Sequence, residues 1–203
     1  SGLLPASGDI RKWSLLSFGP YLIFAFSTHS CKHLAMLILG IDPGSRITGF
    51  GVLEIIKNKS STMTVRHVSH GVILLEAKMP FALRMKELGE SMQSLLEKYK
   101  PEQVVIEKIF LGKNADSAFK LGHARGVAMY ESACSGAEVI EYATRLVKKG
   151  IAGSGGASKE EVQQCLQRLL KIPTIQRIDA SDALAMATYH AYQMLNPLLF
   201  KSR

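Results

Sequence analysis

Four acidic residues stand where apolar segments end or begin, and their carboxylates are the first candidates for chemistry. Asp42 follows the apolar run 37–41, and Glu107 follows the apolar run 104–106. Asp179 and Asp182 lie three residues apart at the start of an apolar segment with helical periodicity, so they share one helix face. A buried carboxylate is unfavourable unless a cation or hydrogen-bond donors accompany it. Together the four acids indicate a site for Mg²⁺ or Mn²⁺, which prefer oxygen ligands.

Such a site would suit phosphodiester hydrolysis. Two divalent ions about 3.5–4 Å apart can activate a water molecule and stabilise the leaving oxygen. The sequence has no His and Cys set with zinc spacing, no Gly-x-Ser-x-Gly and no Gly-x-x-x-x-Gly-Lys. These absences exclude the hydrolase and phosphate-loop patterns that are easiest to recognise.

Read singly, each acid also has a structural explanation that stays open. Asp179 could cap a helix N-terminus, and Asp182 could be a first-turn acid that interacts favourably with the helix dipole. Asp42 or Glu107 could form a turn at a strand end.

The elements that must position these acids follow from periodicity and turn signals. Gly49 and Gly51 in the second strand permit close approach of another backbone. Ser158 and Glu161 form a capping box at the start of a helix. The predicted strands are 36–42, 47–55, 64–75, 103–107 and 138–141, and the predicted helices are about 88–99, 117–131, 159–170 and 180–195. This order predicts one α/β domain.

Composition narrows the class of partner. The 203 residues include 25 Lys plus Arg against 17 Asp plus Glu, for a net charge of +8, and 47% are hydrophobic. A real core is therefore expected, general disorder is excluded, and an anionic partner is favoured, nucleic acid first. Three widely spaced cysteines exclude a disulfide framework and fit a reducing cytosol.

Residues 1–35 differ from the rest of the chain. The apolar run 13–26 is shorter than the roughly 20 residues that a membrane span needs, and Gly19-Pro20 interrupts it. We interpret residues 1–35 as a non-native or upstream-translated extension, with a genuine targeting segment as the alternative. Residues 36–203 form the predicted working domain, with 22 basic and 16 acidic residues, or +6.

Four motifs in order resemble the RuvC-type Holliday junction resolvases. They are GIDPGSRITGFG (40–51), VIEKIF (105–110), KNADSAFKLGHARGVA (113–128) and DASDALAMA (179–187), and the likeness runs from about residue 36 to 193. The resemblance implies an RNase H-like α/β fold with a five-stranded mixed sheet flanked by helices. It implies a Mg²⁺-dependent endodeoxyribonuclease, with Mn²⁺ as a substitute and two ions per active site. The implied metal ligands and catalytic residues are Asp42, Glu107, Asp179 and Asp182.

The same resemblance implies partners and a product. A cytoplasmic homodimer would place two active sites on a four-way DNA junction, nick two strands of like polarity and leave 5′-phosphate and 3′-hydroxyl ends. The RuvA–RuvB branch-migration complex is the implied protein partner, and no membrane is involved. The implied DNA contacts are Phe110, Lys113, Arg145, Lys148, Lys149 and Lys159.

Several readings stay open beside this one. Phe110 could be a core residue, and Arg145 and Lys149 could be solvated surface charges. Lys149 and Gly150 also stand where the family usually has Gln and Thr or Ala. The small-residue stripe of Ala118, Gly122 and Gly126 could pack on the sheet or lie at the dimer contact.

The alternative functions are a YqgF-type RNase H-like nuclease acting on RNA and a non-catalytic junction-binding protein. An actin-like ATP-binding protein shares the Asp-x-Gly-Ser pattern at 42–45. It needs two such domains and a second phosphate loop, which 168 residues cannot supply.

Overall fold

The computed structural model describes residues 35–57, 62–108 and 115–196. The chain divides into two units, residues 1–32 and 33–203, and every described helix and strand belongs to the second. The predicted extension therefore lies outside the described residues, except for Ala35, which begins the first strand.

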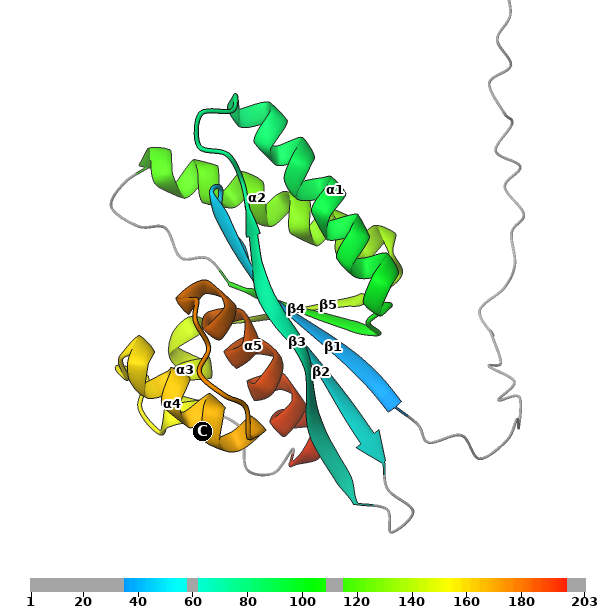
Figure 1. The fold of residues 1–203 in the computed structure, drawn as a ribbon, viewed down its shortest axis with the longest axis vertical. Helices are drawn as coiled ribbons and strands as arrows, with labels where there is room; N and C mark the ends of the chain where they lie inside the picture. The colour runs from blue at the N-terminus through cyan, green and yellow to red at the C-terminus, as the bar shows by residue number, and fades with distance from the viewer. Residues whose placement is uncertain (1–34, 58–61, 109–114, 197–203) are drawn as a thin grey trace, which may run out of the picture. The chain divides into compact units, whose positions relative to one another are not determined.

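A five-stranded mixed sheet forms the centre of the second unit (Figure 1). Its order is β3-β2-β1-β4-β5, with β1–β2 and β2–β3 antiparallel and β1–β4 and β4–β5 parallel. The strands are β1 (Ala35–Asp42), β2 (Ile47–Lys57), β3 (Met63–Leu74), β4 (Gln103–Glu107) and β5 (Glu138–Tyr142). This arrangement confirms the predicted five-stranded α/β architecture.

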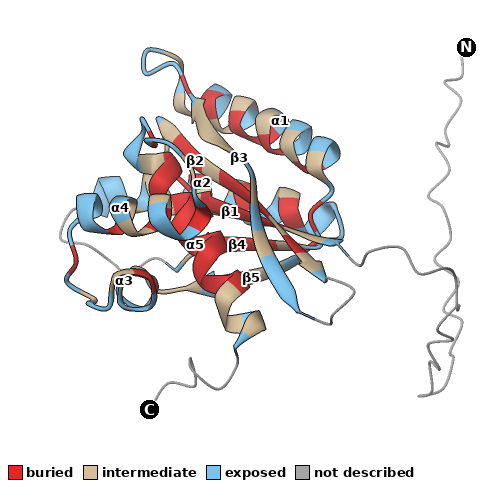
Figure 2. Ribbon diagram, turned by 60° about the horizontal axis from the view of Figure 1, so that its bottom comes forward, coloured by how far each residue is buried: buried red, intermediate tan, exposed pale blue. Residues whose placement is uncertain are grey.

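Helices cover both faces of the sheet (Figure 1). On one face lie α1 (Phe81–Tyr99) and α2 (Ala115–Cys134); on the other lie α3 (Thr144–Ala152), α4 (Lys159–Leu170) and α5 (Ile178–Leu195). Successive residues of a strand point to opposite faces, so Ile38 joins the core under α3–α5 while Leu39 joins the core under α1 and α2. Helix α5 is the most buried helix, as Figure 2 shows.

Two helices differ from the sequence expectation. The structure begins α1 at Phe81, before the predicted start at about residue 88. The buried residue in the first turns is Arg84, so the apolar pattern used for the prediction begins only at Leu88. Helix α3 was not predicted, because Gly150 lies inside it and the glycine-rich stretch to Gly156 reads as a loop. Its buried residues are Val147 and Ile151, which are one helical turn apart.

The predicted capping box of α4 is confirmed. The Glu161 backbone N–H donates to Ser158 Oγ at 3.1 Å, and the Ser158 N–H donates to Glu161 Oε2 at 2.7 Å. In the described ranges, no helix is long and apolar enough to cross a membrane.

Candidate active site

Two parallel strands end side by side and deliver the first two acids. Strand β1 pairs with β4 in the register Ile41↔Ile106, so Asp42 and Glu107 follow at adjacent positions. The two carboxyl groups are close enough for Glu107 to raise the pKa of Asp42. Because each apolar run fills the core on both faces of the sheet, its final carboxylate is the first polar group at this edge.

Glycines bring the N-terminal part of α5 down onto β1 and β2. A Cβ atom added at Gly49 would lie 2.0 Å from the Asp179 carbonyl oxygen, and one at Gly40 would lie 2.1 Å from the Ala183 carbonyl oxygen. At Gly51 an added Cβ would lie 2.7 Å from the Leu184 Cα. The close approach that Gly49 and Gly51 were predicted to permit is therefore present. It places the start of α5 at the ends of β1 and β4.

The charge on Asp42 is strongly disfavoured without a cation. Burial, which is the largest cause, and the neighbouring carboxylates of Glu107 and Asp182 together raise the pKa of Asp42 to about 8. Lys159 acts in the opposite direction. Three of the four predicted acids therefore lie within electrostatic reach of one another, and a positive charge is what would allow them to ionise together.

A lysine from α4 supplies one such charge. Lys159 Nζ lies 2.6 Å from Asp182 Oδ2. Burial opposes the ammonium charge, but the hydrogen bond to Asp182 and the fields of Asp42 and Asp179 outweigh it and raise the Lys159 pKa. Asp179 itself lies 3.9 Å from Arg177. The fourth acid is thus electrostatically linked to the cluster through Lys159.

The carboxylates suit a hard divalent ion by chemistry, because all the donors are oxygen atoms from Asp and Glu. Over the described residues, however, no group of three or more His, Cys, Asp or Glu side chains is already arranged to hold a metal ion. Lys159 binds Asp182, and the Thr144 hydroxyl donates to Glu107. Rotation of these side chains would have to accompany metal binding.

Two residues that sequence reasoning missed hold Glu107 in place. Besides the Thr144 contact, Arg125 Nε of α2 donates to the Glu107 carbonyl oxygen at 2.9 Å, and its guanidinium pairs with Glu141. The available signal was an arginine among the small residues Ala124, Gly126 and Ala128 of α2. Thr144 gave no signal, because α3 itself was not predicted.

Besides Lys159, which pairs with Asp182, the predicted DNA-contact residues fall into three groups. Phe110 and Lys113 lie outside the described residues. Arg145 and Lys149 are exposed on α3. Lys148 is half-buried; its Nζ donates to the Ala157 carbonyl oxygen at 2.8 Å, and it lines a hollow of about 30 Å³ with Glu107 and Asp182.

Two structural alternatives are wrong. The N-cap of α5 is Arg177, without a side-chain cap, so Asp179 lies in the first turn and does not cap the helix.

On α2, the buried residues are Ala124, Ala128 and Ser132, whereas Gly122 and Gly126 have nothing within 4 Å of an added Cβ. The two glycines therefore do not pack on the sheet, and their place at a dimer contact stays a prediction.

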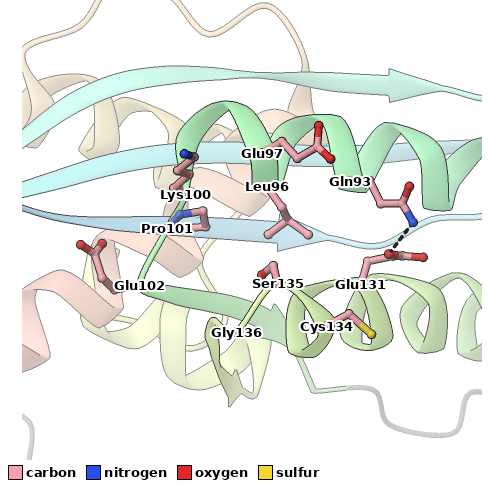
Figure 3. Close-up of a pocket in the computed structure, with 10 residues that line it drawn as sticks. All are labelled: Gln93, Leu96, Glu97, Lys100, Pro101, Glu102, Glu131, Cys134, Ser135 and Gly136. Atoms are coloured by element: carbon pink, nitrogen blue, oxygen red, sulfur yellow. Dashed lines mark hydrogen bonds between the residues drawn. The ribbon is translucent and has the colours of Figure 1, made fainter. Parts of the chain in front are cut away.

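A wider cavity lies elsewhere, between the C-terminal parts of α1 and α2 (Figure 3). It has a volume of about 590 Å³, and Gln93 Nε2 donates to Glu131 Oε2 across its wall at 2.9 Å. None of the four predicted acids lines it. The candidate active site lies instead at the strand ends, where Glu107 and Asp182 line only the small hollow of about 30 Å³.

Comparisons with known proteins agree with this geometry. A family model described as crossover junction endodeoxyribonuclease RuvC matches residues 38–190. The RuvC of Bdellovibrio bacteriovorus is 61% identical over 168 residues, covering 83% of this chain and 97% of the relative. The RuvC of Geobacter sulfurreducens is 45% identical over 156 residues, covering 77% and 92%. A solved structure of Thermus thermophilus RuvC with a Holliday junction substrate has a TM-score of 0.71 at 28% identity, covering 80% and 96%.

These matches confirm the predicted RNase H-like fold. They also decide against the YqgF-type nuclease and the actin-like ATP-binding protein, because the RuvC model spans all the described elements from β1 to most of α5. The chain belongs to the RuvC family of crossover junction endodeoxyribonucleases.

Proposed function

We propose that this protein is an endonuclease that resolves Holliday junctions during recombination and repair by paired nicks. The observation that carries the proposal is the meeting of Asp42, Glu107 and Asp182, from three separate elements, in a chain of this family. A non-catalytic junction-binding protein would have no need to gather carboxylates whose mutual repulsion destabilises the fold.

Proteins of this family are divalent-metal-dependent nucleases. Here Mg²⁺ is the proposed ion, with Mn²⁺ as a substitute and two ions per site, held by Asp42, Glu107, Asp179 and Asp182. When bound, the ions would activate the attacking water and stabilise the leaving oxygen, which leaves a 5′-phosphate and a 3′-hydroxyl. The raised pKa of Asp42 supports this assignment, because a cation is the group that would let these acids ionise together.

The chain's own residues have distinct parts in this proposal. Asp42 is central, since both Glu107 and Asp182 act on it. Thr144 and Arg125 orient Glu107 through its carboxylate and its carbonyl group. While no DNA is bound, Lys159 neutralises Asp182. When DNA binds, the Lys159 ammonium can contact the phosphate next to the cut.

Basic residues around the acids would bind the junction backbone. Lys148 and Lys159 lie beside the acids, whereas Arg145 and Lys149 extend the positive surface along α3. Phosphate contacts position nucleic acid without reading its sequence, so these side chains would give affinity and orientation. Phe110 and Lys113 are proposed contacts from the family resemblance alone.

We also propose that the protein acts as a homodimer, with the RuvA–RuvB complex as a further partner, in the cytoplasm. Exposed residues on α2 support the dimer. Gly122 and Gly126 leave open space, and Phe119 and Tyr130 are 70% and 65% exposed. Family membership supports the RuvA–RuvB assignment.

The decisive experiment incubates the full chain with a synthetic four-way junction and Mg²⁺, beside a linear duplex of the same sequence. We expect paired nicks in the junction that DNA ligase reseals, and no nicks in the duplex. Asp42→Asn should abolish cutting while retaining junction binding. The matched control is Asp116→Asn, an exposed acid that pairs with Lys120 on α2 and should cut normally. Cutting by Asp42→Asn at the normal rate, or equal cutting of the duplex, would refute the proposal.

A further inference from the structure

An irregularity in the edge strand β3 brings two histidines together. The β2–β3 register runs Leu53↔His67, Val52↔Ser69 and Gly51↔His70, so Val68 is an extra residue without a partner. In a regular strand, residues three apart point to opposite faces. The extra residue of a bulge shifts this alternation by one, so His67 and His70 lie on the same face.

The two imidazoles are in direct contact on that face. His67 Nε2 and His70 Nδ1 are 2.8 Å apart, and the ring centroids are 4.9 Å apart. The face is the one that α5 covers, since Leu184 packs against Gly51, the cross-strand partner of His70. Both rings are half-buried. Burial lowers the pKa of both, so both are neutral near pH 7.

We propose that His67 and His70 form a two-histidine binding site for a borderline transition-metal ion: Ni²⁺, Cu²⁺ or Zn²⁺. Neutral imidazole nitrogen is a preferred ligand of these ions. Two nitrogens on a tetrahedral Zn²⁺ ion, each at about 2.05 Å, are about 3.4 Å apart. Side-chain rotations that widen the observed contact by roughly half an ångström would therefore be sufficient.

The facing nitrogens can both become ligands without loss of a proton. In the observed contact, one of them carries a hydrogen and donates it to the other. When the donor ring shifts its hydrogen to its far nitrogen, both facing lone pairs are free, and both rings stay neutral. Solvent water would fill the remaining coordination positions, because the described part of the chain groups no third His, Cys, Asp or Glu with this pair.

This site differs in chemistry from the acids at the strand ends. Carboxylates select hard ions such as Mg²⁺, whereas imidazoles select the later transition metals. Affinity should follow the order expected for nitrogen ligands, with Cu²⁺ above Ni²⁺ and Mg²⁺ not bound. A bound ion would also link the two sides of the bulge and stabilise the folded edge strand.

Isothermal titration calorimetry of the full chain with NiCl₂ tests the proposal. The titrations use an Asp42→Asn background, which weakens Ni²⁺ binding at the acids. His67→Gln and His70→Gln should each lower the Ni²⁺ affinity of one site at least tenfold, because a single imidazole cannot chelate. The matched control is His123→Gln, an exposed histidine on α2 whose Nδ1 contacts the Phe119 carbonyl oxygen. Binding is compared as a difference between variants, since His29, Cys31 and His33 are present in all of them.

A second measurement does not depend on the folding of variants. Substoichiometric Ni²⁺ should broaden the imidazole proton resonances of His67 and His70 in the unsubstituted protein before those of His123 and His190. Unchanged Ni²⁺ affinity in both single variants would overturn the proposal, and so would equal broadening of all four histidines.

Discussion

Substituting Gly49 by alanine should disable the active site without touching any acid. The added Cβ would lie 2.0 Å from the Asp179 carbonyl oxygen and 3.0 Å from the Ala180 nitrogen. Real Cβ contacts essentially never fall below 3.0 Å. The start of α5 must therefore move away from β2 by at least about 1 Å, and Asp179 and Asp182 move with it. Both neighbours are backbone atoms, so rotation of a side chain cannot relieve the clash.

The magnitude follows from that displacement. A misplacement of about 1 Å in a catalytic constellation can lower the rate about 100-fold. Overpacking of a core costs about 1–3 kcal/mol of stability, which is small enough for many domains to stay folded. We therefore expect Gly49→Ala to fold, to bind the junction and to cut it about 100-fold more slowly.

The assay is single-turnover cleavage of a labelled four-way junction at saturating Mg²⁺. A gel-shift measurement of junction affinity and a urea titration of the free energy of unfolding accompany it. Gly89→Ala on α1 is the matched control, because its added Cβ meets only side-chain atoms at 3.4 and 3.6 Å. It should keep the normal rate, and alanine in a helix interior should stabilise it by about 0.5–1 kcal/mol. A Gly49→Ala rate within threefold of the unsubstituted enzyme would refute the idea that close glycine packing positions the α5 acids.

Three further predictions concern residues around the site and the sheet. Thr144→Val removes the hydroxyl that donates to Glu107 and should lower the single-turnover rate about tenfold. Thr144→Ser keeps a hydroxyl and should keep the normal rate; equal rates for the two variants would exclude an orienting role for Thr144. Lys149→Ala should reduce the slope of log affinity against log salt by about one, and an unchanged slope would show that this lysine contacts no phosphate. Burial lowers the pKa of His190 in the folded state. Below about pH 6.5, the ordinary pKa of histidine, the unfolded chain therefore binds more protons than the folded chain, and the free energy of unfolding falls as the pH falls. His190→Gln should flatten this part of the profile in urea titrations between pH 7 and pH 5, and a profile as steep as before would contradict the assignment.

His190 takes part in a chain of hydrogen bonds that runs from Tyr142 out to the exposed pair of Gln103 and Glu138. Its Nδ1 lies 2.8 Å from Tyr142 Oη, and its Nε2 lies 2.8 Å from Gln103 Oε1. Gln103 Nε2 in turn donates to Glu138 Oε2 at 2.8 Å. Because an amide oxygen only accepts, His190 carries its hydrogen on Nε2 and accepts from the tyrosine at Nδ1. A proton on Nδ1 would remove this acceptor.

The sequence alone was sufficient for the features that local patterns encode. Apolar runs ending in Asp42 and Glu107 predicted central strands with acids at their ends, because strand burial leaves a strong compositional mark. The small residues Gly49 and Gly51 predicted a close backbone approach. The Ser-x-x-Glu spacing of Ser158 and Glu161 also predicted the capping box. In each case the residues that determine the structure are neighbours in the chain.

Other predictions were wrong, or missed an element, where the local signal was ambiguous. Helix α3 was missed because Gly150 lies inside it, although Val147 and Ile151 are its buried positions. The stripe of Ala118, Gly122 and Gly126 could pack on the sheet or lie at the dimer contact, and only the tertiary structure shows that Ala124 and Ala128 are buried positions of α2. Thr144 has no pattern at all, since its role depends on a residue 37 positions away.

What the sequence determined by itself was the chemistry: oxygen ligands at strand ends, a positive surface and a family signature. The tertiary structure decided which groups meet. It brought Lys159 onto Asp182 across 23 positions, and Arg125 onto the end of β4. It also placed His67 against His70, which a regular strand would separate. The physical reason is that side-chain types and short-range periodicity are local properties, whereas contacts depend on strand register and helix packing. A single unpaired residue, Val68, is enough to change which side chains share a face of the sheet.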